Sequence, residues 1–86
     1  MDVSLEITLS PLQDGFEEVI IAFIKKLRAS GFTVKENSLS THVYGPYKQV
    51  TTYVMDAVEE TFAGCDAILC YVKMVKSDRS AYEPKF

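Results

Sequence analysis

The chain is poor in the residues from which most small catalytic and metal-binding sites are built. Its 86 residues include one histidine, two cysteines and no tryptophan. Cys65 and Cys70 stand five positions apart, which matches neither the C-x-x-C pattern of redox and zinc sites nor a framework of several disulfides. We therefore expect two reduced structural thiols, no metal site and no resident cofactor.

Long apolar runs and an excess of positive charge are also missing. No stretch approaches the roughly 18 uncharged apolar residues that a membrane span needs. The alternating start from Met1 to Glu6 has neither the basic end nor the apolar run of a signal peptide. The formal net charge is −3 and the isoelectric point is about 5.0, which argues against a nucleic-acid-binding face. The sequence therefore predicts a cytoplasmic protein with no membrane or nucleic-acid partner.

None of the short motifs that carry well-understood chemistry occurs in the chain. There is no phosphate-binding loop, no G-x-G-x-x-G, no H-E-x-x-H and no G-x-S-x-G. The only histidine, His42, stands in an alternating segment, and by itself it supplies neither the partner nor the orienting group of a general base. We therefore predict that the protein is not an enzyme.

What the chain does have is clear hydrophobic periodicity. A period of two over residues 3–9 predicts a half-buried strand that ends at Pro11, because proline cannot donate to a sheet ladder. A period of 3.6 over residues 16–27 predicts a helix, with Asp14 and Glu17 at the spacing of a capping box. The inward residues are Val3, Leu5, Ile7 and Leu9 in the strand, and Phe16, Val19, Ile20, Phe23, Ile24 and Leu27 in the helix.

The second half of the chain repeats these patterns. Residues 32–36 and 40–44 predict two short strands joined by a turn. A second helix begins with Pro46 at its first helical position and ends at Gly64. Residues 67–75 predict a fourth strand that is apolar on both faces, and such strands are usually covered on both faces. The apolar stripe of the second helix comprises Val50, Tyr53, Val54, Ala57, Val58, Thr61 and Phe62.

This order of elements predicts an α+β, ferredoxin-like βαββαβ fold: a four-stranded antiparallel sheet with two helices on one face. Residues 1–76 form the domain and residues 77–86 a polar C-terminal tail. Nothing else in the chain is expected to cover the other, partly apolar sheet face, so we expect self-association through the sheet as a homodimer or tetramer. The predicted open face carries Glu6, Thr8, Thr33, Lys35, His42 or Thr41, Tyr44, Leu69 and Tyr71.

The polar and aromatic residues near this open face are candidate ligand contacts, and each also has an ordinary structural interpretation. The carboxylate is either solvated or paired with a cationic ligand or a subunit partner. The hydroxyls are either plain strand residues or hydrogen-bonding ligand contacts. The histidine and the tyrosines either pack or contact a flat heterocycle. These candidates are Glu6, Thr8, Ser10, Thr41, His42, Tyr44 and Tyr71.

A ferredoxin-like fold hosts many functions, so the choice among them depends on residues. Residues 10–14 contain neither the C-x-x-C of a heavy-metal carrier nor the glycine-rich, arginine-bearing loop of an acylphosphatase. Glu6 and Thr8 stand where an RNA-recognition motif has aromatics. These three functions are therefore disfavoured.

Two segments do stand out together. The first strand ends in Leu9-Ser10-Pro11-Leu12 and is followed by Phe16-Glu17-Glu18-Val19, and the third strand reads Ser40-Thr41-His42-Val43-Tyr44-Gly45. The end of the first strand and the segment Phe16-Glu17-Glu18-Val19 together resemble the opening of each repeat of the YkoF-like family. The last segment resembles the Ser-Thr-x-x-x-Gly of those repeats and the Thr-x-Ile-x-Gly of the broader thiamine-binding protein family. The resemblance covers about residues 3–76, and Tyr44 stands where the broader family often has an acidic residue.

This resemblance implies a domain that binds thiamine or its hydroxymethylpyrimidine half and associates through its sheet. YkoF carries two repeats in one chain, so a homodimer of this chain would reproduce the pair. Position by position, the resemblance implies Thr8, Ser40 and Thr41 as ligand contacts, and Glu6 can accept from an exocyclic amine. Our hypothesis is non-catalytic binding of such a ligand by a homo-oligomeric cytosolic carrier or sensor. The alternative is an ACT-like regulatory or assembly module that binds another small metabolite.

Overall fold

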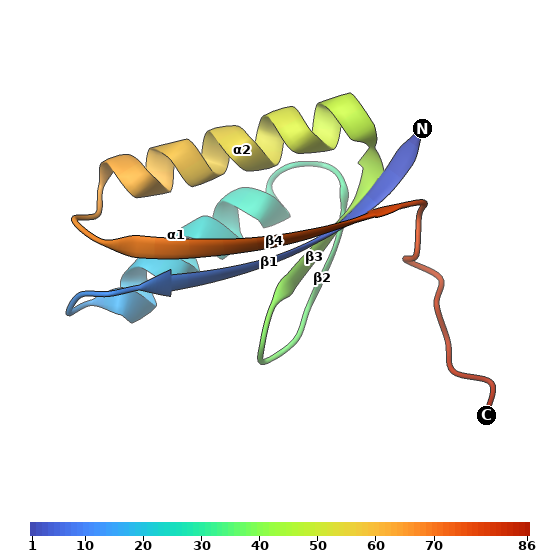
Figure 1. Ribbon diagram of the computed structural model, residues 1–86, viewed down its shortest axis with the longest axis horizontal. Helices are drawn as coiled ribbons and strands as arrows, with labels where there is room; N and C mark the ends of the chain where they lie inside the picture. The colour runs from blue at the N-terminus through green and yellow to red at the C-terminus, as the bar shows by residue number, and fades with distance from the viewer.

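The computed structural model describes all 86 residues and has the predicted order of elements (Figure 1). The strands form one antiparallel sheet in the order β2-β3-β1-β4, which confirms the ferredoxin-like α+β fold. None of the helices is long and apolar enough to cross a membrane. The elements are β1 (Asp2–Pro11), α1 (Phe16–Arg28), β2 (Thr33–Glu36), β3 (Thr41–Pro46), α2 (Tyr47–Ala63) and β4 (Ile68–Lys76).

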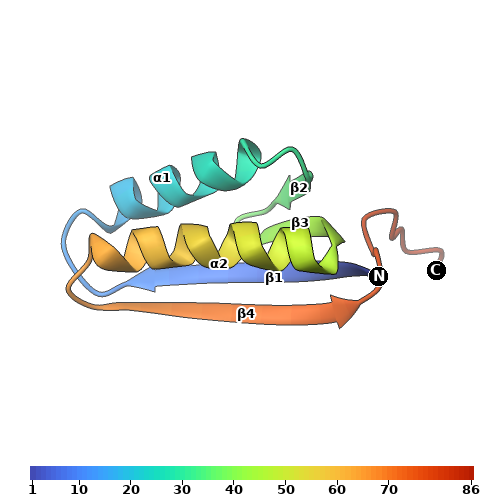
Figure 2. The same cartoon turned by 90° about the horizontal axis from the view of Figure 1, so that it is seen from above.

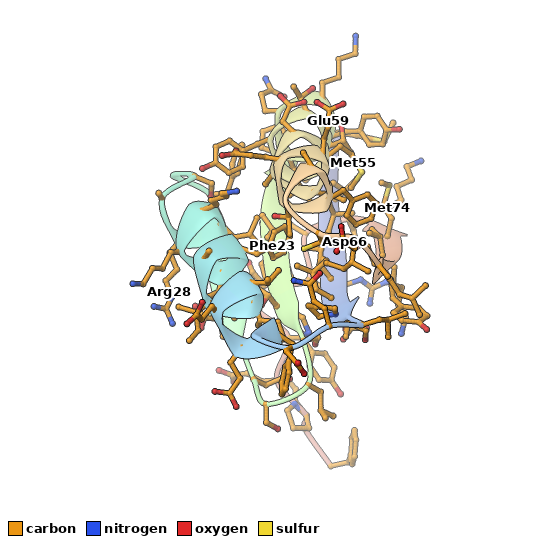
Figure 3. The ribbon with its side chains drawn as sticks, turned by 90° about the vertical axis from the view of Figure 1, so that its left-hand side faces the viewer. Phe23, Arg28, Met55, Glu59, Asp66 and Met74 are labelled. Carbon is orange, nitrogen blue, oxygen red and sulfur yellow. The ribbon has the colours of Figure 1, made fainter.

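Both helices cover the same face of the sheet (Figures 1 and 2). The core fills the space between these two layers, where Phe23 points inward from α1 (Figure 3). Arg28 lies on the outer side of α1 and donates to Glu36 of β2. Burial of each large apolar side chain of the core contributes about 1.5–3 kcal/mol relative to exposure. The buried core comprises Val3, Leu5, Ile7, Leu9, Phe23, Leu27, Val43, Val50, Val54, Ala57 and Val58.

The central strand, β1, extends beyond one of its two neighbours. It pairs with β3 only as far as Ile7 opposite Thr41, but it pairs with β4 as far as Pro11 opposite Ile68. The end of β1 therefore lacks a strand partner on the β3 side. The loop between β2 and β3 lies there instead, which leaves space beneath α1.

Local details at the helix ends differ from the predictions. The capping box at Asp14 and Glu17 is wrong, because Gly15 is the N-cap of α1 in a left-handed conformation (φ 76°) and no side chain caps the helix. Pro46 is the N-cap of α2 and the last residue of β3, and is not the first helical residue. The predicted inward residues Phe16 and Phe62 are 49% and 42% exposed, because they stand in the terminal turns of their helices.

The fourth strand lies at an edge of the sheet, and the expectation that both its faces are covered is wrong within this chain. Leu69, Tyr71, Val72 and Met74 are each at least 42% exposed. Both cysteines are free.

The C-terminal tail, residues 77–86, turns back after β4 onto the side of the sheet away from the helices (Figure 1). Its first residues are held by Ser4 of β1, whose Oγ donates to the Ser77 carbonyl at 2.7 Å and accepts from the Arg79 amide at 2.9 Å. The face that the helices leave open is thus partly covered by the tail of the same chain.

Gly45 lies where β3 passes close to α2, and its substitution tests this packing. A Cβ at this position would meet Val50 Cγ2 at 2.9 Å and Phe32 Cδ1 at 3.2 Å. We expect Gly45→Ala to lower the free energy of unfolding by about 1–3 kcal/mol, as overpacking does in other cores, measured by urea denaturation. Gly64→Ala is the matched control, because its Cβ would meet nothing closer than 3.8 Å. Equal stability of the two variants would contradict the close packing at Gly45.

Candidate functional site

The strand register gathers charged side chains in one row across the open face. Lys35 of β2 pairs with His42 of β3, His42 pairs with Glu6 of β1, and Glu6 pairs with Lys73 of β4. Because side chains alternate between the two faces of a strand, all four project away from the helices. Glu6 thus stands between the imidazole of His42 and the ammonium of Lys73, and Lys35 lies beyond His42.

Glu6 is the centre of a hydrogen-bonded cluster. Its Oε2 accepts from the Ser40 hydroxyl at 3.1 Å and lies 3.0 Å from His42 Nε2, while its Oε1 lies 3.6 Å from Lys73 Nζ. The hydrogen bonds from Ser40 and His42 lower the pKa of Glu6 below its ordinary value, with smaller contributions from the charges of Lys73 and His42. The carboxylate is therefore held in its ionised form at neutral pH.

His42 links this carboxylate to Tyr44. Its Nδ1 lies 3.1 Å from the Tyr44 hydroxyl, and the two rings pack edge to face. Burial raises the pKa of Tyr44, as do the negative charges of Asp78 and Glu6. An ionised carboxylate can only accept a hydrogen bond, so Nε2 is the donor in the contact with Glu6, while the protonated phenol of Tyr44 contacts Nδ1.

The contact between Ser40 and His42 does not have the polarity of a nucleophile and its base. Ser40 Oγ lies 3.0 Å from His42 Nε2, a distance that such a pair would show. However, Nε2 is already a donor to Glu6, and the group on Nδ1 is a neutral phenol and not a carboxylate that would stabilise an imidazolium ion. No group of three or more potential metal ligands lies together either. The Ser40–His42 pair is therefore not arranged for acyl transfer.

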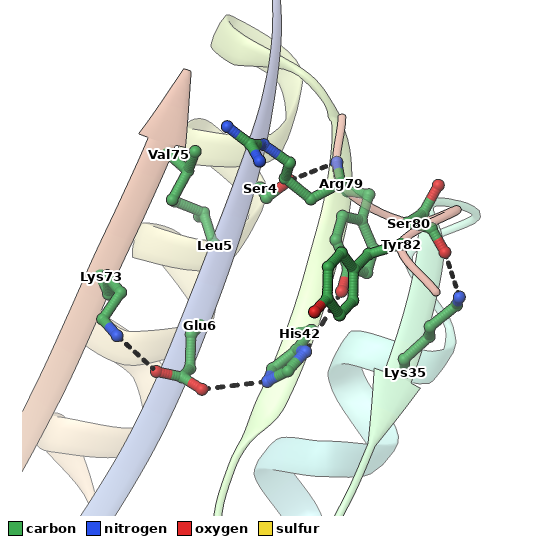
Figure 4. Close-up of a pocket in the computed structure, with 11 residues that line it drawn as sticks. Ser4, Leu5, Glu6, Lys35, His42, Lys73, Val75, Arg79, Ser80 and Tyr82 are labelled. Carbon is green, nitrogen blue, oxygen red and sulfur yellow. Dashed lines mark hydrogen bonds and ion pairs between the residues drawn. The ribbon is translucent and has the colours of Figure 1, made fainter. Parts of the chain in front are cut away.

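The tail turns this cluster into one wall of a cavity of about 300 Å³ (Figure 4). Ser4, Glu6, His42 and Tyr44 line it from the sheet, and Arg79, Ser80 and Tyr82 line it from the tail. Lys35 donates from β2 to the Ser80 carbonyl, which anchors the far side of the tail. Tyr44 is only 8% exposed although it stands on the open face. This open-face cavity is at the lower end of the volume range of small-molecule sites.

A second cavity of about 230 Å³ lies beneath α1, at the end of β1 that lacks a β3 partner. Its walls are Ile7 and Leu9 of β1 and three apolar residues of α1, and Thr8, Ser40 and Thr41 line it from the sheet and the β2–β3 loop. The Thr8 hydroxyl donates to the Leu39 carbonyl at 3.3 Å, across the same gap. We refer to this space as the α1 cleft.

The eight predicted ligand contacts thus divide among three places. Glu6, His42 and Tyr44 line the open-face cavity, and Thr8, Ser40 and Thr41 line the α1 cleft. Tyr71 lines a third hollow of about 350 Å³ together with Glu6 and Thr8, and Ser10 lines none of the three. Ser40 connects the two cavities, because its hydroxyl bonds to Glu6 and contacts His42.

The sequence left open whether Thr41 or His42 lies on the open face, and the structure decides between them. His42 lies on the open face, whereas Thr41 is 5% exposed on the helix side, where it pairs with the buried Ile7. Tyr71 lies beside Thr8 on the open face and is 59% exposed.

Several lining residues were not among the predicted contacts. Ser4, Lys73 and Val75 stand at ordinary strand positions and belong to no motif. Arg79, Ser80 and Tyr82 belong to a polar tail with no periodic pattern. The one signal in the tail is its aromatic content, since Tyr82 and Phe86 stand among polar residues.

Comparison with known proteins identifies solved structures of the same fold. No protein-family model matches the chain, and no curated protein matches it in sequence. A Streptococcus pneumoniae protein aligns with a TM-score of 0.84 at 20% identity, over 94% of this chain and 92% of its own. A Thermotoga maritima protein, provisionally named as a thiamine biosynthesis/salvage protein, aligns at 0.80 and 16% identity, over 90% and 85%. A domain of unknown function from Bacillus cereus aligns at 0.75 and 15% identity, over 91% and 78%. At these identities the likeness shows a shared fold.

The attachment of the tail to Ser4 is open to a direct test. Ser4→Ala removes the donor to Ser77 and the acceptor for Arg79, so we expect the free energy of unfolding to fall by about 1 kcal/mol per lost hydrogen bond. The Arg79 amide should lose its protection from hydrogen exchange, as measured by NMR. Ser38→Ala, in an exposed loop, is the control. Full protection of the Arg79 amide in Ser4→Ala would show that the tail is held by something else.

Proposed function

We propose that the protein binds thiamine, or its hydroxymethylpyrimidine half, in the open-face cavity and releases it chemically unchanged. The observation that carries the proposal is the ionised Glu6 carboxylate in the wall of a cavity of ligand size, beside a tyrosine of the sheet and a tyrosine of the tail.

An aminopyrimidine complements these groups. Its exocyclic amine is a donor, and Glu6 Oε1 has only the distant Lys73 ammonium as a partner, so this oxygen is available as an acceptor. The Tyr82 ring lies in the tail at 67% exposure and can stack against a flat heterocycle. A few polar groups on one side and an apolar or aromatic cover on the other are usual in small-molecule sites.

Two further observations support a thiamine-related ligand. Ser40, one of the residues that carry the resemblance to the YkoF-like family, takes part in the Glu6 cluster. One of the solved structures with this fold carries a provisional name in thiamine biosynthesis or salvage. The α1 cleft, which holds Thr8 and Thr41, is the competing location for the same ligand.

The proposal includes self-association through β4. An edge strand with exposed apolar side chains favours pairing with another chain. Val72 and Met74 are 42% and 46% exposed on the helix side, and Met55 of α2 lies at the same margin as Met74 (Figure 3). We therefore expect the carrier or sensor to be a homo-oligomer that pairs through this surface.

Calorimetric titration with thiamine and with hydroxymethylpyrimidine tests the binding site. We expect both to bind, and Glu6→Gln to weaken binding by about tenfold, because it replaces a charge-assisted hydrogen bond with a neutral one. Glu36→Gln is the matched control, since Glu36 is a strand carboxylate paired with Arg28 outside the cavity. NMR of the recovered ligand should show no conversion.

The outcomes separate the alternatives. Loss of binding in Thr8→Val with Thr41→Val, but not in Glu6→Gln, would move the site to the α1 cleft. Absence of heat at millimolar concentrations of both ligands would reject the proposal. Thermal stabilisation by an amino acid, and not by either pyrimidine, would favour the ACT-like alternative.

Light scattering coupled to size exclusion tests the role of β4. We expect the wild-type chain to elute as an oligomer and Val72→Lys with Met74→Lys to elute as a monomer, because lysines on an edge strand oppose strand pairing. Ile21→Lys places the same charge on an exposed residue of α1 and should leave the oligomer intact. A wild-type monomer at all concentrations would contradict self-association.

A further inference from the structure

The open-face cavity contains more positive than negative side chains, although the whole chain carries a formal net charge of −3. Lys35, Lys73 and Arg79 line it together with one carboxylate, Glu6. A neutral or cationic ligand has no group that would use this excess of positive charge.

The charges are not spread evenly around the cavity. Lys35 donates to the Ser80 carbonyl on the far side of Tyr82 (Figure 4). Its charge also acts on Asp78, where it adds to the hydrogen bonds from Ser80 in lowering the pKa of that carboxyl. The positive charge of Lys35 and the negative charge of Asp78 therefore offset each other on that side of the cavity.

Arg79 lies on the other side and has no carboxylate partner. Its Nε donates to Ser77 Oγ at 2.8 Å, and it takes part in none of the ion pairs of the chain. A guanidinium has five N–H donors in a planar fork, and the two terminal nitrogens of Arg79 make no hydrogen bond within the chain. These are the donors that bind phosphate oxygens in pairs.

Lys73 is the second cation of this side. Its only ionic contact is the 3.6 Å approach to Glu6, and its side chain is 74% exposed. An exposed ion pair of this length contributes little stability, so Lys73 can turn toward a ligand at small cost. Figure 4 shows Lys73 and Arg79 on either side of Val75, at the side of the cavity formed by β4.

We propose that the cavity selects a phosphate ester of the heterocycle, with Arg79 and Lys73 binding the phosphate while Glu6 and His42 hold the ring. This inference rests on the proposed function, because it assigns the ring to the Glu6 cluster. The hydroxyl group of hydroxymethylpyrimidine or of thiamine is the position of the ester. The phosphate stands at the β4 side, where Arg79 has no carboxylate partner and Lys73 has only the 3.6 Å contact with Glu6.

Paired titrations of thiamine with thiamine monophosphate, and of hydroxymethylpyrimidine with its phosphate, test the inference. The ester lies one methylene from the pyrimidine in hydroxymethylpyrimidine phosphate and beyond the thiazole in thiamine monophosphate, so the two differ in reach. We expect the ester whose reach matches the separation of Glu6 from Arg79 to bind about tenfold or more tightly than its parent alcohol, as two charge-assisted contacts would give. The preference should shrink as the salt concentration rises, because these contacts are partly exposed.

Variants locate the phosphate. Arg79→Gln should weaken binding of the ester more than binding of the alcohol and so remove most of the preference, and Lys73→Gln should reduce the preference. Arg79→Lys keeps the charge without the fork, so it should retain part of the preference and also show whether the tail tolerates substitution. Lys25→Gln, on an exposed part of α1, makes the same change in net charge and is the control.

The inference and the proposed function fail in different ways. Binding of the alcohols with no gain for either phosphate ester, or an equal loss for alcohol and ester in Arg79→Gln, would overturn the phosphate site and leave the proposed function standing. Absence of binding by all four compounds would overturn both. Competition by inorganic phosphate against the ester, but not against the alcohol, would support the assignment.

Discussion

The pairing of β1 with both of its neighbours is the constraint on which the site depends. The register places Glu6 opposite His42 on one side and Lys73 on the other. A shift of one residue would turn Glu6 toward the core and expose Leu5 and Ile7, whose burial opposes such a shift. The hydrophobic face of β1 therefore determines the chemistry of its polar face. The same register leaves the end of β1 without a β3 partner, which opens the α1 cleft.

The tail converts a flat sheet face into a cavity. A ferredoxin-like domain that ended at β4 would present Tyr44 and the Glu6 cluster to solvent, and ligands bind more tightly in concave sites than on flat surfaces. Ser4 connects the two parts, since its hydroxyl is both donor and acceptor to the tail. The tail also supplies Arg79 and Tyr82, so one of the two cations proposed for the phosphate, and the ring proposed for stacking, come from outside the secondary structure. Ligand binding and tail docking should therefore depend on each other.

Sequence patterns predicted the sheet and helices because burial of one face of each element spaces its apolar residues at a regular period. The alternation of Val3, Leu5, Ile7 and Leu9 and the stripe that includes Phe23 and Leu27 follow directly from which side chains face the core. The capping box was wrong because a glycine with a left-handed backbone begins α1 without a side-chain cap. Among the predicted contacts, Glu6 and Tyr44 could be assigned to the open face, because successive side chains of a strand alternate between its two faces. The choice between Thr41 and His42 required the exact start of β3, which propensity does not determine.

The sequence by itself determined the order of the elements, the ferredoxin-like fold and the side of β1 that faces away from the helices, since all three depend on local periodicity. Only the tertiary structure decided that Glu6, Ser40 and His42 form one cluster, that Thr8 and Thr41 belong to a separate cleft, and that Arg79 reaches the cavity. These relations join residues more than 30 positions apart, through strand register and a few hydrogen bonds. Such long-range contacts produce no repeating pattern of residues in the sequence.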